Sequence, residues 1–184
     1  QTRSTFAATL ATVLTLAPDR LAVFNYAHLP QIFKHQRLIQ EEWLPPAAEK
    51  LELLKLGIES LTGAGYVYIG MDHFAKPENE LAQALAAGTL YRNFQGYSTH
   101  AGLDLIALGM SSISMLADLY VQNQKTLGEY YWALDAGHLP TLRGVALTPD
   151  DQIRRAVIVT LMCNFVLDKG RVEERYGIVF DDYF

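Results

Sequence analysis

The stretch PPAAEKLELLKLGIESLTGAGYVYIGMDHF, residues 45–74, indicates how the chain folds. Pro45-Pro46 is a helix-start signal, and the residues after it include apolar side chains at helical spacing, namely Leu51, Leu54, Ile58 and Leu61. Gly63 and Gly65 predict the end of this helix, because glycine readily adopts the left-handed conformation found there. The apolar run 66–69 follows at once and predicts a strand buried on both faces. We therefore expect a helix followed directly by an interior strand.

The same order of elements occurs earlier in the chain. Residues 1–16 have helical spacing and are followed by the apolar run 21–24, while residues 104–108 are a third candidate strand. Alternation of this kind predicts an α/β fold, with a parallel sheet covered by helices. Ligands bind beyond the carboxyl ends of such strands, so we expect a site formed by residues 25–28, 70–74 and 109–114.

The stretch NFQGYSTH, residues 93–100, interrupts this regular pattern. It follows a predicted short helix near residues 78–88 and has neither a helical period nor the alternation of a strand. We expect a loop in which Phe94 and Gln95 converge on one ligand, the ring by stacking and the amide by hydrogen bonding.

From about residue 122 the sequence predicts helices alone. Residues 122–136 and 172–184 have helical spacing, and Thr148-Pro149-Asp150-Asp151 combines a capping threonine, proline at the first helical position and acids in the first turn. The helix that begins there is expected to run to about residue 167. We place the boundary between an α/β part, residues 1–140, and a small all-helical domain, residues 141–184.

Composition excludes several classes of protein. The chain has 184 residues, half of them hydrophobic, which fits one domain with a sizeable core. The 15 basic and 20 acidic residues give a net charge of −5, which argues against nucleic-acid binding. No apolar run reaches the roughly 18 residues of a membrane helix, and the start does not resemble a signal peptide. The single cysteine, Cys163, fits a reducing compartment, so we expect a cytoplasmic globular protein.

Several polar residues are candidates for chemistry, each with a structural alternative. Asp72 and His73 could form an acid/base unit at a strand end, or Asp72 could cap a turn while His73 bonds to the backbone. Arginines can bind carboxylates through two hydrogen bonds, and Arg92, Arg143, Arg154 and Arg155 are the candidates. For Arg154 and Arg155 a solvated ion-pair face is favoured. Five scattered histidines and one cysteine have no metal-ligand spacing, and Cys163 is expected to be a small core residue.

Six segments, in order along the chain, resemble the oxygen-independent coproporphyrinogen III oxidases, which are radical S-adenosylmethionine enzymes of haem biosynthesis. These segments are FNYAHLP (24–30), GYVYIGMDHFAKPENELA (65–82), RNFQGYSTH (92–100), GMSSIS (109–114), QNQKTLGEYY (122–131) and RGVALTPDDQIRRAVIVTLMCNF (143–165). The resemblance covers essentially the whole chain. It implies the C-terminal part of a partial TIM-type barrel followed by the family's helical domain.

The resemblance also implies a site and a reaction. The family binds two S-adenosylmethionine molecules beside a [4Fe-4S] cluster, and the matching cofactor-binding positions here are Ala27, Phe94, Gln95 and Ile113. The implied reaction is oxidative decarboxylation of two propionates of coproporphyrinogen III to vinyls, which gives protoporphyrinogen IX. Arg92, His73 and Asp72 are candidates for contact with this tetrapyrrole substrate.

One departure from the family pattern limits these expectations. The cluster needs three cysteines spaced Cys-x3-Cys-x2-Cys, and this chain has one. We therefore expect a C-terminal portion of such an enzyme that is inactive alone and that self-associates through an uncovered sheet edge and apolar surface, whereas the parent enzyme is expected to be a monomer. Two other readings stay open, a haem-binding chaperone of the same superfamily and a scaffold without activity of its own.

Overall fold

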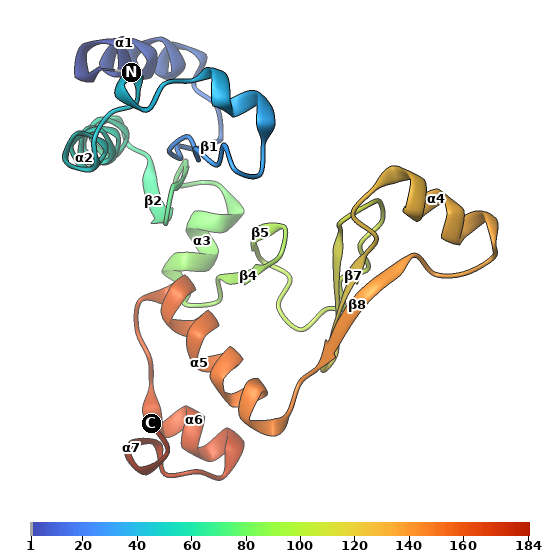
Figure 1. Cartoon of the computed structure of the whole chain (residues 1–184). Helices are drawn as coiled ribbons and strands as arrows, with labels where there is room; N and C mark the ends of the chain where they lie inside the picture. The colour runs from blue at the N-terminus through green and yellow to red at the C-terminus, as the bar shows by residue number, and fades with distance from the viewer. Residues whose placement is uncertain (1) are drawn as a thin grey trace. The chain divides into compact units, whose positions relative to one another are not determined.

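The computed structural model describes residues 2–184, which form two compact units (Figure 1). The first unit ends at Ala87 and the second spans Gly88–Phe184. The elements of the first unit are α1 (Arg3–Leu16), β1 (Arg20–Ala22), the 3-10 helices η1 (Lys34–Leu38) and η2 (Glu41–Trp43), α2 (Ala47–Gly63), β2 (Val67–Gly70), β3 (His73–Ala75) and α3 (Glu80–Ala86). Those of the second are β4 (Tyr91–Asn93), β5 (Gly96–Ser98), β6 (Ile113–Leu116), β7 (Leu119–Asn123), α4 (Leu127–Asp135), β8 (Thr141–Ala146), α5 (Pro149–Asn164), α6 (Lys169–Tyr176) and α7 (Phe180–Tyr183).

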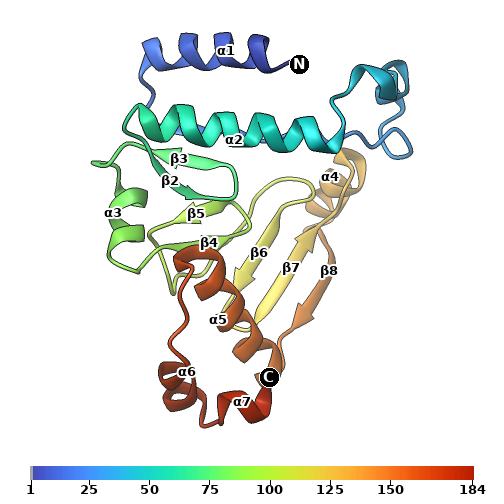
Figure 2. The same ribbon diagram turned by 90° about the vertical axis from the view of Figure 1, so that its left-hand side faces the viewer.

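The core of the first unit lies between its two long helices and its sheet. Leu10 of α1, Leu61 of α2, and Tyr66 and Phe74 from the sheet region are all buried and form one cluster. α1 and α2 lie side by side in both ribbon views (Figure 2). The helix predicted after Pro45-Pro46 and the strand predicted at residues 66–69 are confirmed. The buried residues of α2 are Leu53, Gly57 and Leu61, of which only Leu61 is among the predicted apolar positions.

The prediction of a parallel sheet is wrong for the described residues, because every strand pair there is antiparallel. β1 and β2 do run in the same direction, but β3 lies between them and pairs with both. The cause is a tight turn after β2, where Gly70 has φ 139° and Met71 has φ 54°. This turn sends His73-Phe74-Ala75 back along the sheet, so the last two residues of the segment expected to be a ligand loop, residues 70–74, belong to strand β3.

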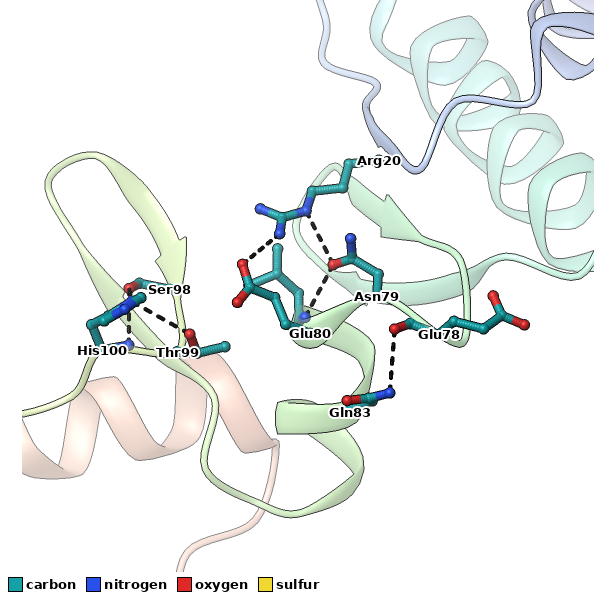
Figure 3. A network of polar contacts seen from close by, with 9 residues as sticks. Arg20, Glu78, Asn79, Glu80, Gln83, Ser98, Thr99 and His100 are labelled. Carbon is teal, nitrogen blue, oxygen red and sulfur yellow. Dashed lines mark hydrogen bonds and ion pairs between the residues drawn. The ribbon is translucent and has the colours of Figure 1, made fainter.

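A polar network joins β1 to the start of α3 (Figure 3). Arg20 Nε donates to Asn79 Oδ1 at 3.0 Å, and Arg20 Nη2 forms an ion pair with Glu80 at 2.6 Å. The same Asn79 oxygen accepts from the backbone N–H of Leu81 and thereby caps the helix. The predicted helix near residues 78–88 is confirmed in this shorter form.

The second unit contains strands that the sequence did not predict. β6, β7 and β8 form a three-stranded antiparallel sheet, and β4 and β5 form a hairpin (Figure 2). The candidate strand at residues 104–108 is wrong, since only Leu105 makes an isolated bridge, to Met115. The expectation of helices alone after residue 122 is also wrong, because β7 extends to Asn123 and β8 occupies residues 141–146. The division at residues 140 and 141 stays a prediction.

The helix predicted from Thr148 is confirmed. Thr148 caps α5 and exchanges hydrogen bonds with Asp151, with Pro149 at the first position. Ile153 and Val157 of α5 pack with Val172 of α6 to form the core beneath the last helices. Cys163 is fully buried, as expected for a core residue, and burial raises the pKa of its thiol. The mixed content of helix and strand confirms the α/β class, while the partial barrel stays a prediction.

Candidate functional site

The stretch NFQGYSTH forms a β-hairpin rather than the expected irregular loop. Asn93 pairs with Gly96, and Phe94 and Gln95 are the two residues at the tip. Asn93 Oδ1 accepts the backbone N–H of Gln95 at 2.8 Å, and Gly96 has φ 122°, a conformation that favours glycine. The tip therefore holds Phe94 in the open, with 54% of its surface exposed.

The far end of the hairpin is fixed by short-range hydrogen bonds, and one face carries an arginine. Ser98 Oγ accepts the backbone N–H of His100 at 3.0 Å just after β5 ends (Figure 3). Arg92 and Tyr97 are direct cross-strand partners, and the Arg92 guanidinium lies 5.5 Å from the centre of the Tyr97 ring. Arg92 Nε is buried and has no hydrogen-bond partner within residues 2–184.

One face of the three-stranded sheet carries a row of one apolar and two polar side chains, one from each strand. Ile113 on β6 is the register partner of Gln122 on β7, and Gln122 is in turn the partner of Arg143 on β8. Side chains of direct cross-strand partners project from the same face of a sheet. Tyr120 and Val145, each two residues along its strand and partners of one another, belong to the same face.

Phe94 and this sheet face form a cleft of about 380 Å³. The cleft is lined by Phe94, Ile113, Tyr120, Val121, Gln122, Arg143, Gly144 and Val145. The Phe94 ring meets the Tyr120 ring edge-on, with centroids 5.3 Å apart and planes at 88°. The structure thus brings together two of the predicted cofactor-binding residues, Phe94 and Ile113, in one cleft.

A second cleft, also of about 380 Å³, shares Phe94 and Tyr120 with the first. It is lined by Tyr91, Arg92, Asn93, Phe94, Met115, Tyr120, Ile158, Val159 and Met162. Arg92 is its one cationic side chain, and burial raises the pKa of Tyr91 beside it. The aromatic pair of Phe94 and Tyr120 therefore borders two clefts, each containing one arginine.

Gln95 lies at the hairpin tip but does not line either cleft. Its side chain is exposed, and its backbone N–H is taken by Asn93. The expectation that Phe94 and Gln95 converge on one ligand stays a prediction.

Ala27 lies in the first unit, in a segment between β1 and η1 that has no regular structure. The buried side chain of Gln36 holds this segment, because Gln36 Nε2 donates to the Ala27 carbonyl at 3.2 Å and Gln36 Oε1 accepts the Leu29 N–H at 2.5 Å. His28 lies beside Tyr26, with ring centroids 5.8 Å apart. A cleft of about 250 Å³ next to this segment is lined by Phe24, Asn25, Tyr26, Ile39, Trp43, Leu44, Pro45, Lys50 and Leu53.

Asp72 and His73 are in contact where the β2–β3 turn ends. Asp72 Oδ1 and His73 Nδ1 are 2.6 Å apart, and both side chains are about one-third exposed. The Tyr68 hydroxyl donates to the Met71 carbonyl at 2.8 Å, and burial together with the negative charge of Asp72 raises the pKa of Tyr68. The two side chains are thus in close polar contact on a hairpin, and their acid/base role stays a prediction.

The described residues lack the ligands of a metal cluster. No group of three or more histidine, cysteine, aspartate or glutamate side chains within residues 2–184 could hold a metal ion. Over the same range no helix has both the length and the apolar character to cross a bilayer.

Sequence reasoning missed Tyr120 and Gln122 as cleft residues. It also named Arg143 only as a general candidate for carboxylate binding. A cleft built from cross-strand partners depends on strand register, and β7 and β8 are separated by the whole of α4. The available signal was local: Asn93 and Gly96 occupy the first and fourth positions of a turn, which these residues favour.

Comparisons with known proteins give a consistent result. No family model matches the chain. The oxygen-independent coproporphyrinogen III oxidases of Salmonella typhimurium and Escherichia coli K12 are 53% and 52% identical to it over 184 residues. That of Synechocystis is 50% identical over 188 residues. Each match covers 100% of this chain and 40% of the relative, so the chain spans about two-fifths of the length of these relatives.

A solved structure is similar over the same extent. It is coproporphyrinogen III oxidase (HemN) from Escherichia coli, named there as a radical SAM enzyme. The TM-score is 0.97 at 52% identity, and the match covers 100% of this chain and 42% of the solved chain.

Proposed function

Because this chain belongs to the oxygen-independent coproporphyrinogen III oxidase family, as a C-terminal portion of such a protein, we propose that it is part of an enzyme that oxidatively decarboxylates coproporphyrinogen III. In that reaction two propionates become vinyls and the product is protoporphyrinogen IX. The observation that carries the proposal is the identity of about half over the entire chain, together with the TM-score of 0.97. Neither the chaperone reading nor the scaffold reading is favoured by any contact in the clefts.

The chain's residues fit part of a cofactor site but not the cluster. The exposed ring of Phe94 offers a stacking surface, and Ile113 supplies an apolar contact in the same cleft. Phe94 and Ile113 would help to hold S-adenosylmethionine, which together with the cluster would supply the radical chemistry that removes hydrogen from a propionate. A [4Fe-4S] cluster needs cysteine thiolates, and the one cysteine here is buried in α5. We therefore propose that the cluster ligands lie outside this chain.

Each predicted residue has a role in this proposal. Phe94, Gln95 and Ile113 are proposed to contact S-adenosylmethionine, and Ala27, which lies in the first unit, is proposed as a separate cofactor contact. Arg92 binds a propionate carboxylate, for which its guanidinium is suited because no ion pair within residues 2–184 engages it. Asp72 and His73 are secondary candidates for substrate contact.

The expectations about the barrel, the helical domain and the cellular location are also proposals. We propose that the chain contributes to a partial barrel of the radical SAM type, that α5 to α7 belong to a helical C-terminal domain, and that the enzyme acts in the cytoplasm. The antiparallel pairing of β1, β3 and β2 restricts the barrel proposal to β1 and β2, the two strands that run in the same direction.

The test uses a joined oxidase, in which this chain follows the N-terminal portion of the Escherichia coli relative. With a reconstituted cluster, reductant and S-adenosylmethionine, the joined oxidase should convert coproporphyrinogen III to protoporphyrinogen IX, measured by chromatography after oxidation to the porphyrins. The 184-residue chain alone should give no product. A joined oxidase that assembles its cluster and binds substrate but forms no product, or a tight haem complex of the isolated chain, would contradict the proposal.

A further inference from the structure

Arg143 is the one cationic side chain that lines the cleft of Phe94 and Ile113. It lies on β8, in the row that begins with Ile113 and continues through Gln122. Arg143 therefore brings a positive charge next to the apolar side chains of Phe94 and Ile113.

The Arg143 guanidinium is held from one side only. Its Nε donates to Gln122 Oε1 at 2.9 Å, and Gln122 Nε2 donates in turn to the Ser111 carbonyl at 3.0 Å. Both polar ends of the Gln122 amide are thus used. The bond to the Ser111 carbonyl fixes the orientation of the amide, so Gln122 Oε1 is the atom that accepts from Arg143. The bond from Nε leaves the two terminal nitrogens of this cleft-lining residue available to another partner.

Arg143 has no acidic ion-pair partner in the described part of the chain. None of the ion pairs formed within residues 2–184 includes it, and the cleft lining contains no aspartate or glutamate. By contrast, Arg154 on α5 pairs with Asp150 at 2.8 Å, and Arg171 on α6 pairs with Asp168 at 3.6 Å. An arginine oriented by an amide, next to exposed aromatic surface and without a carboxylate of its own, has the features of an anion-binding residue.

We propose that Arg143 binds a carboxylate of the ligand held against Phe94 and Ile113, and that Gln122 is the residue that positions it. The inference rests on the proposed function, under which two ligands carry carboxylates: the propionates of the tetrapyrrole and the amino-acid end of S-adenosylmethionine. The planar guanidinium matches a carboxylate through two parallel hydrogen bonds, which an ammonium group cannot reproduce.

The experiment compares each ligand with a counterpart that lacks the carboxylate. Binding to the joined oxidase is measured for coproporphyrin III against its tetra-amide, and for S-adenosylmethionine against its decarboxylated form. Arg143→Met should weaken binding of one carboxylate ligand by about 10- to 100-fold and leave its counterpart unchanged. Arg143→Lys keeps the positive charge but loses the planar pair of donors. Its affinity for that carboxylate ligand should lie between those of the unsubstituted oxidase and Arg143→Met. Arg171→Met is the matched control, because Arg171 is exposed and lines none of the clefts.

The pattern of losses identifies the source of the carboxylate. A loss confined to coproporphyrin III assigns Arg143 to a propionate, and a loss confined to S-adenosylmethionine assigns it to the amino-acid carboxylate; either supports the inference. Unchanged affinity for both, in an oxidase whose unsubstituted form binds them, overturns it.

A separate titration distinguishes this inference from the proposed function. If the joined oxidase binds neither ligand, the proposed function fails. The nitrogen NMR signal of Arg143 Nε in the 184-residue chain is then titrated with propionate and with propionamide. A shift with propionate alone supports a carboxylate site, and no shift with either overturns it.

Discussion

Phe94, at the tip of the β4–β5 hairpin, meets Tyr120 of β7 edge-on, with ring centroids 5.3 Å apart. This contact connects an exposed hairpin to a sheet with which it shares no strand pairing. It also places one aromatic ring at the border of both clefts, each of which contains an arginine.

Phe94→Ala should therefore affect ligand binding more than folding. Loss of the edge-to-face pair is expected to cost about 1 kcal/mol in the free energy of unfolding. Loss of the stacking surface should weaken S-adenosylmethionine binding to the joined oxidase by about 10-fold or more. The measurements are urea denaturation and equilibrium binding. Trp132→Ala on α4 is the control, since Trp132 is 72% exposed and lines neither cleft; an equal loss of binding in both variants would argue against a role for Phe94.

Gln122→Glu tests whether the positive charge of Arg143 is needed for ligand binding while Arg143 itself is kept. The new carboxylate can accept from Arg143 Nε as the amide does, but it neutralises the guanidinium that the ligand needs. We expect binding of the carboxylate ligand to fall about as far as in Arg143→Met, while urea denaturation should show a loss of about 1 kcal/mol, because the hydrogen bond from Gln122 Nε2 to the Ser111 carbonyl is lost. Binding at the unsubstituted level in Gln122→Glu would show that the charge of Arg143 is not available to a ligand.

The parts of this fold that the sequence predicted are those governed by neighbours along the chain. α5 begins where Thr148, Pro149 and Asp151 supply a cap, a fixed φ and a first-turn acid. α2 begins after Pro46, which stands at the cap position without a side-chain cap bond, and has Glu49 in its first turn. In both cases the decisive contacts join residues no more than four positions apart.

The parts that were missed depend on contacts between distant residues. The sequence predicts a loop where β3 lies, because nothing in His73-Phe74-Ala75 reveals that this segment pairs with two strands at once. The cleft likewise depends on the register that sets Gln122 opposite Arg143. A shift by one residue would send Arg143 to the other face of the sheet, so the sequence could name the arginine but not its neighbours.

Gln36→Ala should loosen the segment that presents Ala27. The substitution leaves the Leu29 N–H and the Ala27 carbonyl without their partner in a part-buried site, at a local cost of about 1–3 kcal/mol. Hydrogen exchange of the Leu29 amide should accelerate by about 10- to 100-fold. The control is Gln83→Ala on α3, where an exposed glutamine donates to the Glu78 carbonyl (Figure 3). Unchanged exchange at Leu29 would mean that Gln36 does not hold the segment.

Gly144→Ala should destabilise the sheet beneath the cleft. A Cβ at position 144 would lie 2.9 Å from the Tyr120 carbonyl oxygen, which is backbone and cannot move without disturbing the pairing of β7 and β8. We expect a loss of about 1–3 kcal/mol in the free energy of unfolding, measured by urea denaturation. Gly128→Ala is the matched control, because a Cβ there meets nothing within 4 Å and alanine favours the helix α4. If both variants have the stability of the unsubstituted chain, the close approach of the two strands is not needed.

The start of α5 should lose stability in acid. Asp151 accepts from the Thr148 hydroxyl at 2.7 Å and from the Thr148 N–H at 2.9 Å, and these bonds hold the pKa of its carboxyl below the ordinary 3.8. The unfolded chain therefore binds this proton more readily than the folded chain. The stabilising contribution is complete above pH 3.8 and is lost as the pH falls through the lower folded pKa.

Carbon NMR of the side-chain carboxyls checks this directly. Thr148→Ala should raise the pKa of Asp151 toward 3.8, because the hydroxyl is its main partner. Arg154→Met should instead act mainly on Asp150, whose pKa is lowered first by Arg154 and then by the Tyr183 hydroxyl. If Thr148→Ala leaves the Asp151 titration in place, the capping bond does not exist in solution, and α5 then owes its start to Pro149 and to the core contacts of Ile153 and Val157.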